Sequence, residues 1–305
     1  MPRLSRVLVF GGSGQLGSEI RRLWTQSRID APSHAEADIN DPAAVAAVIE
    51  AGAPDAVVNC AAFHRVEECE SHVQQALAAN AIAVSALAEA CAERGIPFVT
   101  ISTDYVFDGT AGRPYAESDA PNPINAYGVS KYAGELLVDR LHAAAYVVRT
   151  CGVYGTRVST TKGYTFIDRI IAQARAGERV RVVDDQIISP TYAAHLAQGL
   201  LQLLEADAPY GLYHMVNEGA VSWHGLAVEA LHAAGIDHEV EPVSSTAWPS
   251  RVRRPEFSAL QNAKLHALGM RMPDWRKGVA DYVRDRSLAE SATPGRSVPE
   301  RAAGE

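Results

Sequence analysis

Short apolar, β-branched runs alternate along the first half of the chain with Ala-, Leu- and Glu-rich segments of helical length. The runs are apolar at almost every position, which is typical of strands buried on both faces of a parallel sheet. The predicted strands are Arg6–Phe10, Ile29–Ser33, Ala56–Asn59, Phe98–Ser102 and Tyr146–Thr150, and the predicted helices are Gln15–Arg28, Pro42–Ala51, Ser71–Arg94 and Ala126–His142. This alternation predicts an α/β fold with helices on both faces of a doubly wound parallel sheet.

The pattern becomes less regular after Cys151. The elements predicted there are helices at Tyr164–Ala176, Tyr192–Glu205 (N-cap Thr191) and Trp223–Ala233 (N-cap Ser222), strands at Val180–Val183 and Leu212–Val216, and a proline-rich loop at Pro242–Pro255. We therefore predict a sheet domain over residues 1–150 and a smaller module over 151–288, interleaved with the first. Residues 289–305 lack periodicity and are predicted to form a disordered tail.

The composition narrows the class of protein. The chain has 305 residues and is 47% hydrophobic and 21% charged, close to the average of soluble globular proteins. With 28 Lys and Arg against 36 Asp and Glu, it has no basic bias toward nucleic acid or an anionic membrane. We expect no metal site, because the four Cys lie far apart and no His pair has metal-binding spacing.

The N-terminus indicates the compartment. The apolar run Arg6–Phe10 meets Gly11 and Gly12 at once, as a strand followed by a turn does, and unlike the apolar region of a signal peptide. We found no apolar run near the ~18 residues of a membrane span. The sequence therefore predicts a cytoplasmic protein with Cys residues that are reduced and buried.

Three glycines follow the first predicted strand, with the spacing Gly11-x-x-Gly14-x-x-Gly17. Glycines at such a turn let the backbone approach a pyrophosphate, whose charge is bound by amides at the helix N-terminus. An ordinary strand–helix turn is the alternative, but the strand before and the helix after favour dinucleotide binding by a Rossmann domain.

The residues after the second predicted strand bear on the choice of cofactor. NAD-specific folds usually place an acid there to bind the ribose hydroxyls. Here the sequence is Ala31-Pro32-Ser33-His34, and Ser33 or His34 could face a 2′-phosphate. This favours NADPH, with NADH left open, since both residues could equally be ordinary loop residues.

Tyr127 and Lys131 stand four residues apart at the start of a predicted helix and therefore share one face. We expect the ammonium to lower the pKa of the phenol toward neutrality, so that it can exchange a proton with an alcohol or ketone oxygen. The alternative is a chance surface pair.

Ser102 and Thr103 stand at the end of a predicted strand, at the sheet edge where ligands bind. A hydroxyl there could bind a substrate carbonyl or merely cap the turn.

Together these motifs resemble the extended short-chain dehydrogenase/reductases, and within them the dTDP-4-dehydrorhamnose reductase family. The stretches that carry the resemblance are Gly11–Gly17, Asp38–Asp41, Val57–Ala62, Ser102–Gly109, Asn125–Glu135, Arg149-Thr150, Val183–Gln186, Ser189–Thr191 and Arg253–Pro255. The run Ser-Thr-Asp-Tyr-Val-Phe-Asp-Gly is the most specific of them. The resemblance spans about Arg6 to Arg286.

The resemblance implies roles for matching residues. Tyr127 would be the general acid and would also contact the cofactor, Lys131 would be its electrostatic partner and the ribose ligand, and Thr103 would donate to the substrate carbonyl. The other implied cofactor contacts are Gly11, Gly14, Gln15, Leu16 and Gly17 at the pyrophosphate, Asp38 and Ile39 on the adenine side, and Ala61 and Ala62 at the middle. Asp104 and Arg254 would contact the substrate, Arg254 at its phosphates. Asn80 would orient this site or be a buried amide bound to backbone.

The implied reaction is reduction of the C4 keto group of a nucleotide-linked 4-keto-6-deoxy sugar by NADPH. A nucleotide-sugar epimerase and a non-catalytic NADP-binding regulatory subunit remain alternatives. A dehydratase is disfavoured because Tyr105 follows Asp104, where such enzymes resemble one another in having a second acid.

Several departures from the family pattern leave the sugar open. Gly152 stands where many rhamnose-pathway reductases have an aromatic residue. Phe63-His64-Arg65 replaces a smaller, more polar segment, and Gly155–Gly163 has the composition of a variable loop near the sugar. The oligomeric state is also open, with a homodimer as one option.

Overall fold

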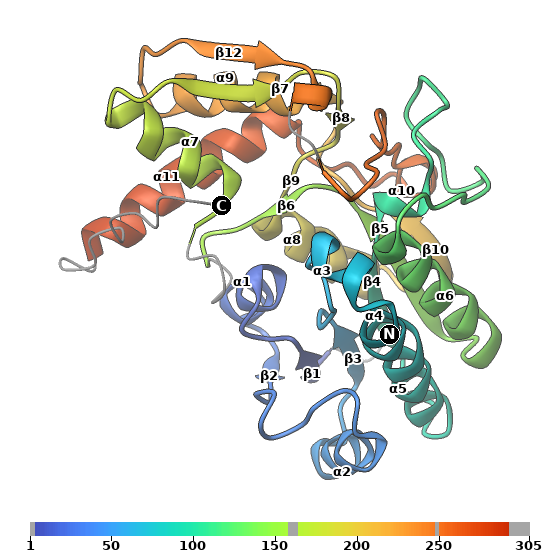
Figure 1. Cartoon of the computed structure of the whole chain (residues 1–305). Coiled ribbons are helices and arrows are strands. Elements are labelled where there is room, and N and C mark those ends of the chain that lie inside the picture. Colours follow the sequence, from blue (N-terminus) through green and yellow to red (C-terminus); the bar gives the residue numbers. More distant parts are fainter. Residues whose placement is uncertain (1–3, 158–163, 248–249, 293–305) are drawn as a thin grey trace.

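A computed structural model describes residues 4–157, 164–247 and 250–292. Its centre is a six-stranded sheet with the order β10-β5-β4-β3-β1-β2, in which every neighbouring pair is parallel. The strands are β1 (Arg6–Phe10), β2 (Arg28–Asp30), β3 (Ala56–Asn59), β4 (Phe98–Thr103), β5 (Ala145–Thr150) and β10 (Gly211–His214). The predicted α/β fold with a doubly wound parallel sheet is confirmed (Figure 1).

Helices cover both faces of this sheet. They are α1 (Gln15–Leu23) and α8 (Ala193–Glu205) on one face, and α2 (Pro42–Gly52), α5 (Ala83–Ala92) and α6 (Ala126–Leu141) on the other. Side chains alternate along β1 between the two faces: Val7 and Val9 pack toward α1 and α8, Leu8 and Phe10 toward α2 and α5. Burial on both sides explains why the strands are apolar throughout.

The predicted helix Ser71–Arg94 is wrong as a single element. The chain instead forms α3 (Val66–Ser71), α4 (Val73–Leu77), the π-helix η1 (Ala78–Ile82) and then α5. By length and composition alone Val73–Ala92 could cross a membrane, which the sequence had not indicated, but 44% of this stretch is buried inside the fold. It packs against α6, as the core helix of a globular protein does.

Two other boundaries differ from prediction for identifiable reasons. Helix α1 ends at Leu23 because Trp24 turns into the core, where its Nε1 donates to the Ala197 carbonyl at 2.9 Å. Thr191 does not cap α8; its hydroxyl donates to the Ser189 carbonyl, and Tyr192 is the N-cap. The predicted N-cap Ser222 is confirmed, accepting from the Gly225 amide at 3.0 Å.

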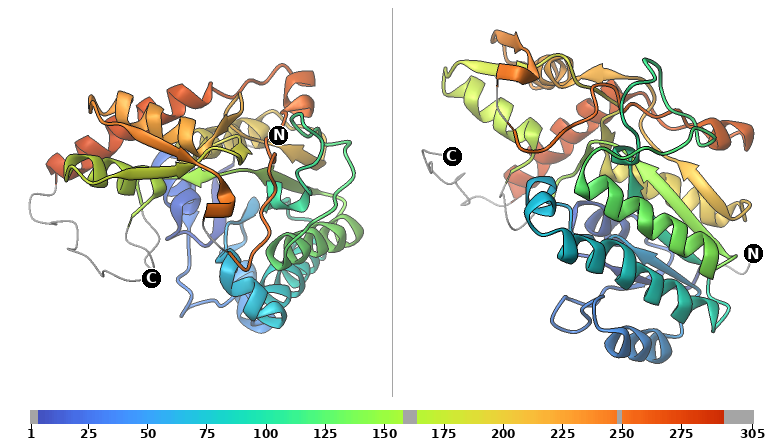
Figure 2. Two further views of the ribbon diagram at one scale, coloured as in Figure 1. Left: turned by 45° about the horizontal axis from the view of Figure 1, so that its top comes forward. Right: turned by 45° about the vertical axis from the view of Figure 1, so that its right-hand side comes forward.

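The second half of the chain forms a smaller module beside the sheet (Figures 1 and 2). Its elements are α7 (Phe166–Arg175), α9 (Trp223–Ala233), α10 (Ala263–Ala267), α11 (Trp275–Ala292), η3 (Ser245–Ala247) and the strand pairs β6 (Val153–Tyr154) with β9 (Thr191–Tyr192), β7 (Val180–Val183) with β12 (Val240–Val243), and β8 (Ile187–Ile188) with β11 (Val221–Ser222). Because β10 and α8 return to the central sheet, the two halves interleave; the domain boundaries stay a prediction.

The C-terminal boundary needs a correction. Helix α11 continues to Ala292, so a disordered tail beginning at residue 289 is wrong for its first four positions. Residues 293–305 lie outside the described part of the chain.

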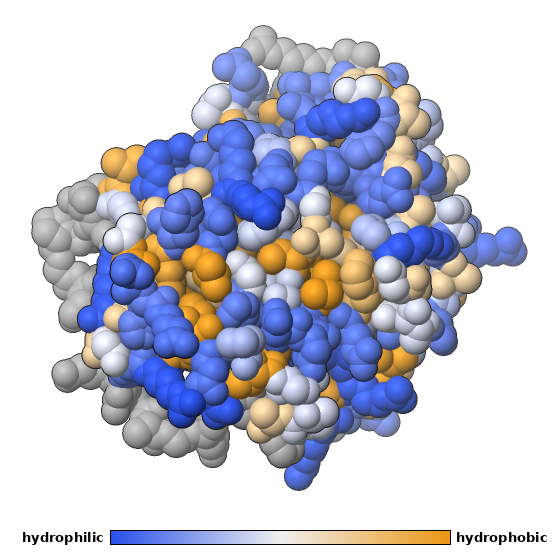
Figure 3. All heavy atoms as spheres, turned by 90° about the horizontal axis from the view of Figure 1, so that it is seen from above, coloured by the Kyte–Doolittle hydropathy of each residue, from blue (hydrophilic) through white to orange (hydrophobic). Residues whose placement is uncertain are grey.

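Seen from above, the molecule presents hydrophobic side chains gathered among hydrophilic ones toward the middle of that face (Figure 3).

Candidate active site

The glycine turn joins β1 to α1. Gly11 has a φ of +76°, and a Cβ there would lie 2.6 Å from the Ala61 amide nitrogen. A Cβ on Gly17 would lie 2.4 Å from the Gly11 carbonyl oxygen. These two glycines are therefore required by backbone packing, which brings the end of β3 against the turn.

Gly14 has a different role. A Cβ there would meet only the Gly11 carbonyl, at 3.3 Å, so the space beyond Gly14 is open. Gly14 is the N-cap of α1 and supplies no side-chain cap to the helix amides. The Oε1 of Gln15 is buried without a hydrogen-bond partner. An open helix N-terminus without a side-chain cap fits a dinucleotide pyrophosphate.

The proposed adenine side lies after β2. Ile39 packs in the same apolar cluster as Phe10. The amide and side chain of Asn40 donate to Asp38, and this backbone bond is the main cause of the lowered Asp38 pKa. The Ser33 hydroxyl and amide both donate to Glu36. Ser33 is therefore held by an acid, whereas the His34 side chain is 82% exposed.

Thr103 and Tyr127 meet at the C-terminal edge of the sheet. Thr103 ends β4, and its hydroxyl donates to Asp104 Oδ1 at 3.1 Å and accepts from the Tyr105 amide at 3.2 Å. Tyr127 lies in the first turn of α6, which the Asn125 side chain caps by accepting from the Gly128 amide at 2.8 Å. A hydrogen bond with the Thr103 side chain favours the ionised phenol of Tyr127.

The expected effect of Lys131 on Tyr127 is wrong. Burial, reinforced by the neighbouring Asp104 carboxyl, raises the pKa of the Tyr127 phenol above its ordinary value instead of lowering it. Among the hydrogen bonds of the described residues, none joins Tyr127 to Lys131. The phenol is therefore protonated at neutral pH.

Lys131 is 5% exposed. Burial lowers the pKa of its ammonium to about 8, while the charges of Glu135 and of Cys60, if ionised, act in the opposite direction. Glu135 pairs with Arg149 at 2.6 Å and accepts from the Ser102 hydroxyl at 2.5 Å. Since Cys60 directly precedes Ala61, Lys131 lies close to the end of β3 and to the glycine turn.

Asn80, in the π-helix η1, holds this region together. Its side chain accepts from the Phe63 amide at 2.8 Å and donates to the Phe63 carbonyl and the Ser130 hydroxyl, both at 2.9 Å. A Cβ at Gly134 would lie 2.2 Å from the Asn80 carbonyl, so α6 approaches η1 closely. The Asn80 amide is bonded through both its oxygen and its nitrogen, which makes it a positioning residue for the segment after β3.

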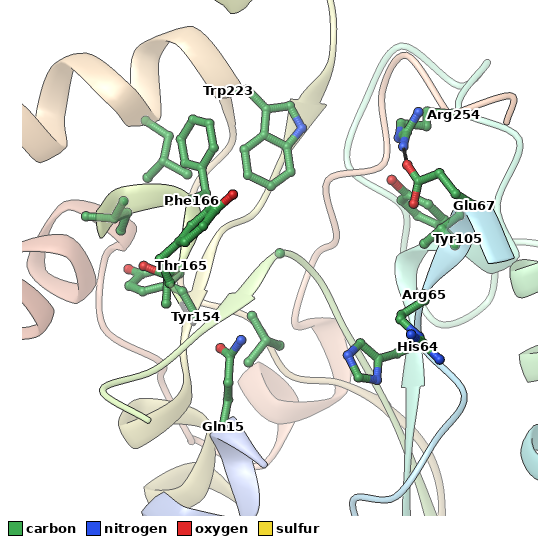
Figure 4. A pocket seen from close by; sticks show the side chains of 16 residues that line it. Gln15, His64, Arg65, Glu67, Tyr105, Tyr154, Thr165, Phe166, Trp223 and Arg254 are labelled. Carbon is green, nitrogen blue, oxygen red and sulfur yellow. Dashed lines mark hydrogen bonds and ion pairs between the residues drawn. The ribbon is translucent and has the colours of Figure 1, made fainter. Parts of the chain in front are cut away.

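A cavity of about 330 Å³ opens beside these residues (Figure 4). Its lining is Gln15, His64, Arg65, Val66, Glu67, Tyr105, Gly152, Val153, Tyr154, Tyr164, Thr165, Phe166, Ile167, Trp223, Leu226 and Arg254. Of the predicted site residues only Gln15 and Arg254 line it. Tyr105 connects it to the predicted acid, because the Tyr105 and Tyr127 rings meet edge to face with centroids 6.0 Å apart.

The cavity has two chemically different walls (Figure 4). We call Phe166 and Trp223, whose ring centroids are 4.9 Å apart, the aromatic wall. We call Arg65, Glu67, Tyr105 and Arg254 the polar wall. The first residues of α7 and α9 supply the aromatic wall, and sequence reasoning missed it because nothing local in the sequence brings the starts of these two helices together.

Arg254, a predicted substrate contact, lines the cavity. It donates through Nη2 to Glu67 and through Nη1 to the Ser250 hydroxyl at 2.9 Å. Asp104, in contrast, does not line the cavity. It is 4% exposed, and burial raises its pKa against the opposing effects of the Ser258, Cys151 and Thr103 side chains.

The four cysteines are not paired with one another. Cys69, Cys91 and Cys151 are buried, Cys60 is partly buried, and all four are free thiols. Within the described ranges, no group of three or more His, Cys, Asp or Glu is arranged to hold a metal ion. Most of the predicted loop Gly155–Gly163 lies outside the described residues.

The chain was compared with known proteins. Residues 5–288 match the family model described as the RmlD substrate binding domain. The dTDP-4-dehydrorhamnose reductase of Mycobacterium tuberculosis is 39% identical over 305 residues, covering 97% of this chain and 98% of the relative. That of Burkholderia thailandensis is 36% identical over 299 residues, covering 92% and 98%. A crystal structure of dTDP-4-dehydrorhamnose reductase from Bacillus anthracis in complex with NADP is 33% identical, with a TM-score of 0.88 over 93% of this chain and 100% of that one.

Proposed function

The chain belongs to the RmlD substrate binding domain family, and from that premise we propose that it reduces the C4 keto group of a nucleotide-activated 4-keto-6-deoxy sugar with NADPH. It is an oxidoreductase of deoxysugar biosynthesis, similar to dTDP-4-dehydrorhamnose reductase. Bound NADPH supplies the hydride, and the chain's own residues place the sugar and supply the proton.

The observation that carries this proposal is the position of Tyr127, whose phenol lies at the sheet edge beside the Thr103 side chain. Burial and Asp104 hold its phenol protonated, and the Thr103 side chain bonds to it at the sheet edge. A reduction needs a proton donor for the oxygen that becomes a hydroxyl. The Tyr127 phenol holds its proton at neutral pH, as an ordinary tyrosine does, and its position beside Thr103 lets it donate that proton to the oxygen as the general acid.

The neighbouring residues then take supporting roles. The Thr103 hydroxyl, which now donates to Asp104, would turn to the keto oxygen and fix it beside Tyr127. Lys131, close to Cys60 and so to Ala61, would bind the cofactor ribose. Gly11, Gly14, Gln15, Leu16 and Gly17 would hold the pyrophosphate, Asp38 and Ile39 the adenine side, and Ala61 and Ala62 the middle.

The two walls of the cavity suit the remainder of the substrate. The diphosphate would bind Arg254, because a guanidinium matches phosphate oxygens in charge and geometry. The base would stack on Phe166 and Trp223, which offer aromatic surface without charge. The sugar would then lie between them, near Tyr105 and toward Tyr127. Asp104 remains a proposed sugar contact, and its side chain would need a small movement to reach the cavity.

The proposal is tested by mixing protein, NADPH and a dTDP-4-keto-6-deoxy sugar and following the loss of NADPH absorbance. Tyr127→Phe should lower kcat by about 10²-fold or more, as loss of a general acid does. Its affinity for NADPH, measured by fluorescence, should stay within about twofold, because the phenylalanine ring keeps the place of the tyrosine ring and Lys131 and the glycine turn are unchanged. Retained turnover would reject the acid role.

The same assay separates the alternatives. NADPH binding without absorbance loss for any 4-keto sugar would indicate a regulatory subunit. Isomerisation of a nucleotide sugar with no net NADPH consumption would indicate an epimerase.

We further propose that the enzyme acts in the cytoplasm and without a metal ion. Its substrate would be a small nucleotide sugar, not nucleic acid or a membrane. Sedimentation would decide between a monomer and a homodimer.

A further inference from the structure

Helix α3 places carboxylates beside both arginines of the cavity. Glu67 accepts from Arg254 Nη2, and Glu68 pairs with Arg65 at 2.8 Å. The guanidinium expected to bind the substrate diphosphate has an anionic partner inside the same cavity (Figure 4). Any phosphate that binds Arg254 must replace that partner.

The position of Arg254 does not depend on Glu67. The Asn125 side chain donates to the Arg253 carbonyl at 3.0 Å, which ties the loop to the N-terminus of α6. The Ser250 hydroxyl accepts from Arg254 Nη1 at 2.9 Å. A Cβ at Gly109 would lie 2.7 Å from Pro255, so the loop also packs closely there. The guanidinium therefore stays in the cavity when its carboxylate partner leaves.

Glu67 can readily give up its ion pair with Arg254. Its side chain is 62% exposed, against 26% for Arg254, so most of its hydration shell is already in place. An exposed ion pair of this kind is weak, and a diphosphate, with more charge and more acceptor oxygens, outcompetes a single carboxylate. The other two acids of α3 are not substitutes, since Glu68 pairs with Arg65 at 2.8 Å and Glu70 accepts from the Ala126 amide at 2.7 Å.

We propose that Glu67 is an affinity-determining residue that competes with the diphosphate of the nucleotide sugar for Arg254; this inference rests on the proposed function. In the free enzyme Glu67 occupies Arg254, and on binding the diphosphate takes its place. The exchange weakens the hold on substrate and product alike, and it returns Arg254 to a paired state when the product leaves.

The test uses the NADPH-loaded protein and dTDP as the probe, with dissociation constants from titration calorimetry. Glu67→Gln should bind dTDP about twofold to fivefold more tightly, the range set by an exposed ion pair. Arg254→Met should weaken binding. In the Glu67→Gln, Arg254→Met double variant the gain should vanish, because the competed group is absent. Glu93→Gln, the same charge change at the end of α5, is the matched control and should bind dTDP as the wild type does.

Other outcomes overturn the inference in distinguishable ways. An unchanged or weaker dTDP affinity in Glu67→Gln rejects competition, and so does a gain that persists in the double variant, which would be a general charge effect. In both cases wild-type turnover of the 4-keto sugar leaves the proposed function intact. A wild type that neither binds dTDP nor consumes NADPH would reject the proposed function and this inference with it.

Discussion

At the scale of single residues, burial acts on two neighbours of α6 in opposite directions. It raises the pKa of the Tyr127 phenol and lowers that of the Lys131 ammonium to about 8, because removal from water disfavours whichever form is charged. The sequence predicted that the two residues share a face, but spacing contains no information on burial. The sign of the tyrosine shift therefore could not be predicted from the pair alone.

Buried Lys131 should cost the fold stability at neutral pH. Between about pH 8 and 10.5 the unfolded chain holds this proton more tightly than the folded one, so stability rises with pH across that interval. Below it, the cost is present in full. Lys131→Met should therefore raise the free energy of unfolding at pH 7 by up to about 3 kcal/mol, since each unit of pKa difference between the folded and the unfolded chain corresponds to about 1.4 kcal/mol. The same substitution should abolish turnover.

Urea unfolding at several pH values checks this prediction. The advantage of Lys131→Met over the wild type should shrink steadily as the pH rises above about 8. Val129→Ala, a change at an exposed position of α6 that removes no titratable group, serves as the control and should show no such pH-dependent difference. If Lys131→Met is less stable than the wild type at pH 7, the ammonium contributes more through contacts than burial costs.

At the scale of elements, the sequence predicted the sheet well and the helix after β3 poorly. Strand β1 and its glycine turn are local features, since the apolar run and Gly11, Gly14 and Gly17 follow each other directly. The π-helix η1 is not local. It places Asn80 against Phe63 and Ser130, which lie 17 and 50 residues away in sequence, and no periodicity reveals such contacts.

The turn itself separates a binding glycine from a packing glycine. Gly14→Ala has room for its methyl group apart from the Gly11 carbonyl at 3.3 Å, and Gly14 has a φ of −73° that alanine adopts freely. The methyl group would occupy the path of the pyrophosphate. We expect the midpoint of thermal unfolding without cofactor to fall by no more than about 3 °C and the NADPH dissociation constant to rise about tenfold or more.

Gly17→Ala is the contrasting variant for the same measurements. Its methyl group would meet the Gly11 carbonyl oxygen at 2.4 Å and Gly12 Cα at 2.6 Å, both backbone atoms that cannot rotate away. The fold should lose about 1–3 kcal/mol, the usual cost of overpacking, before any cofactor is added. Equal effects of the two substitutions on stability would contradict the division of roles.

At the scale of the whole molecule, the cavity exists only because the two halves of the chain meet. The polar wall comes from the segments after β3 and β4 and from the Arg254 loop, and the aromatic wall comes from α7 and α9. The sequence identified Arg254 and Gln15 through family motifs. It could not identify Tyr105, Phe166 or Trp223 as neighbours, since tertiary packing alone brings these distant segments together.

This division predicts separable contributions to binding, which Trp223 tests. Thymidine carries the base without phosphates, and dTDP carries both. Trp223→Ala should weaken the two ligands by the same factor, about fivefold to a hundredfold, as loss of aromatic stacking does. Arg254→Met should weaken only dTDP, and added salt should weaken dTDP binding without affecting thymidine. Calorimetry on NADPH-loaded protein measures the dissociation constants of both ligands for the wild type and for each variant, and Val228→Ala, a solvent-facing change on the same helix α9, is the control. If Trp223→Ala weakens dTDP but leaves thymidine unchanged, the base does not stack on this wall and the substrate lies in the cavity in another orientation.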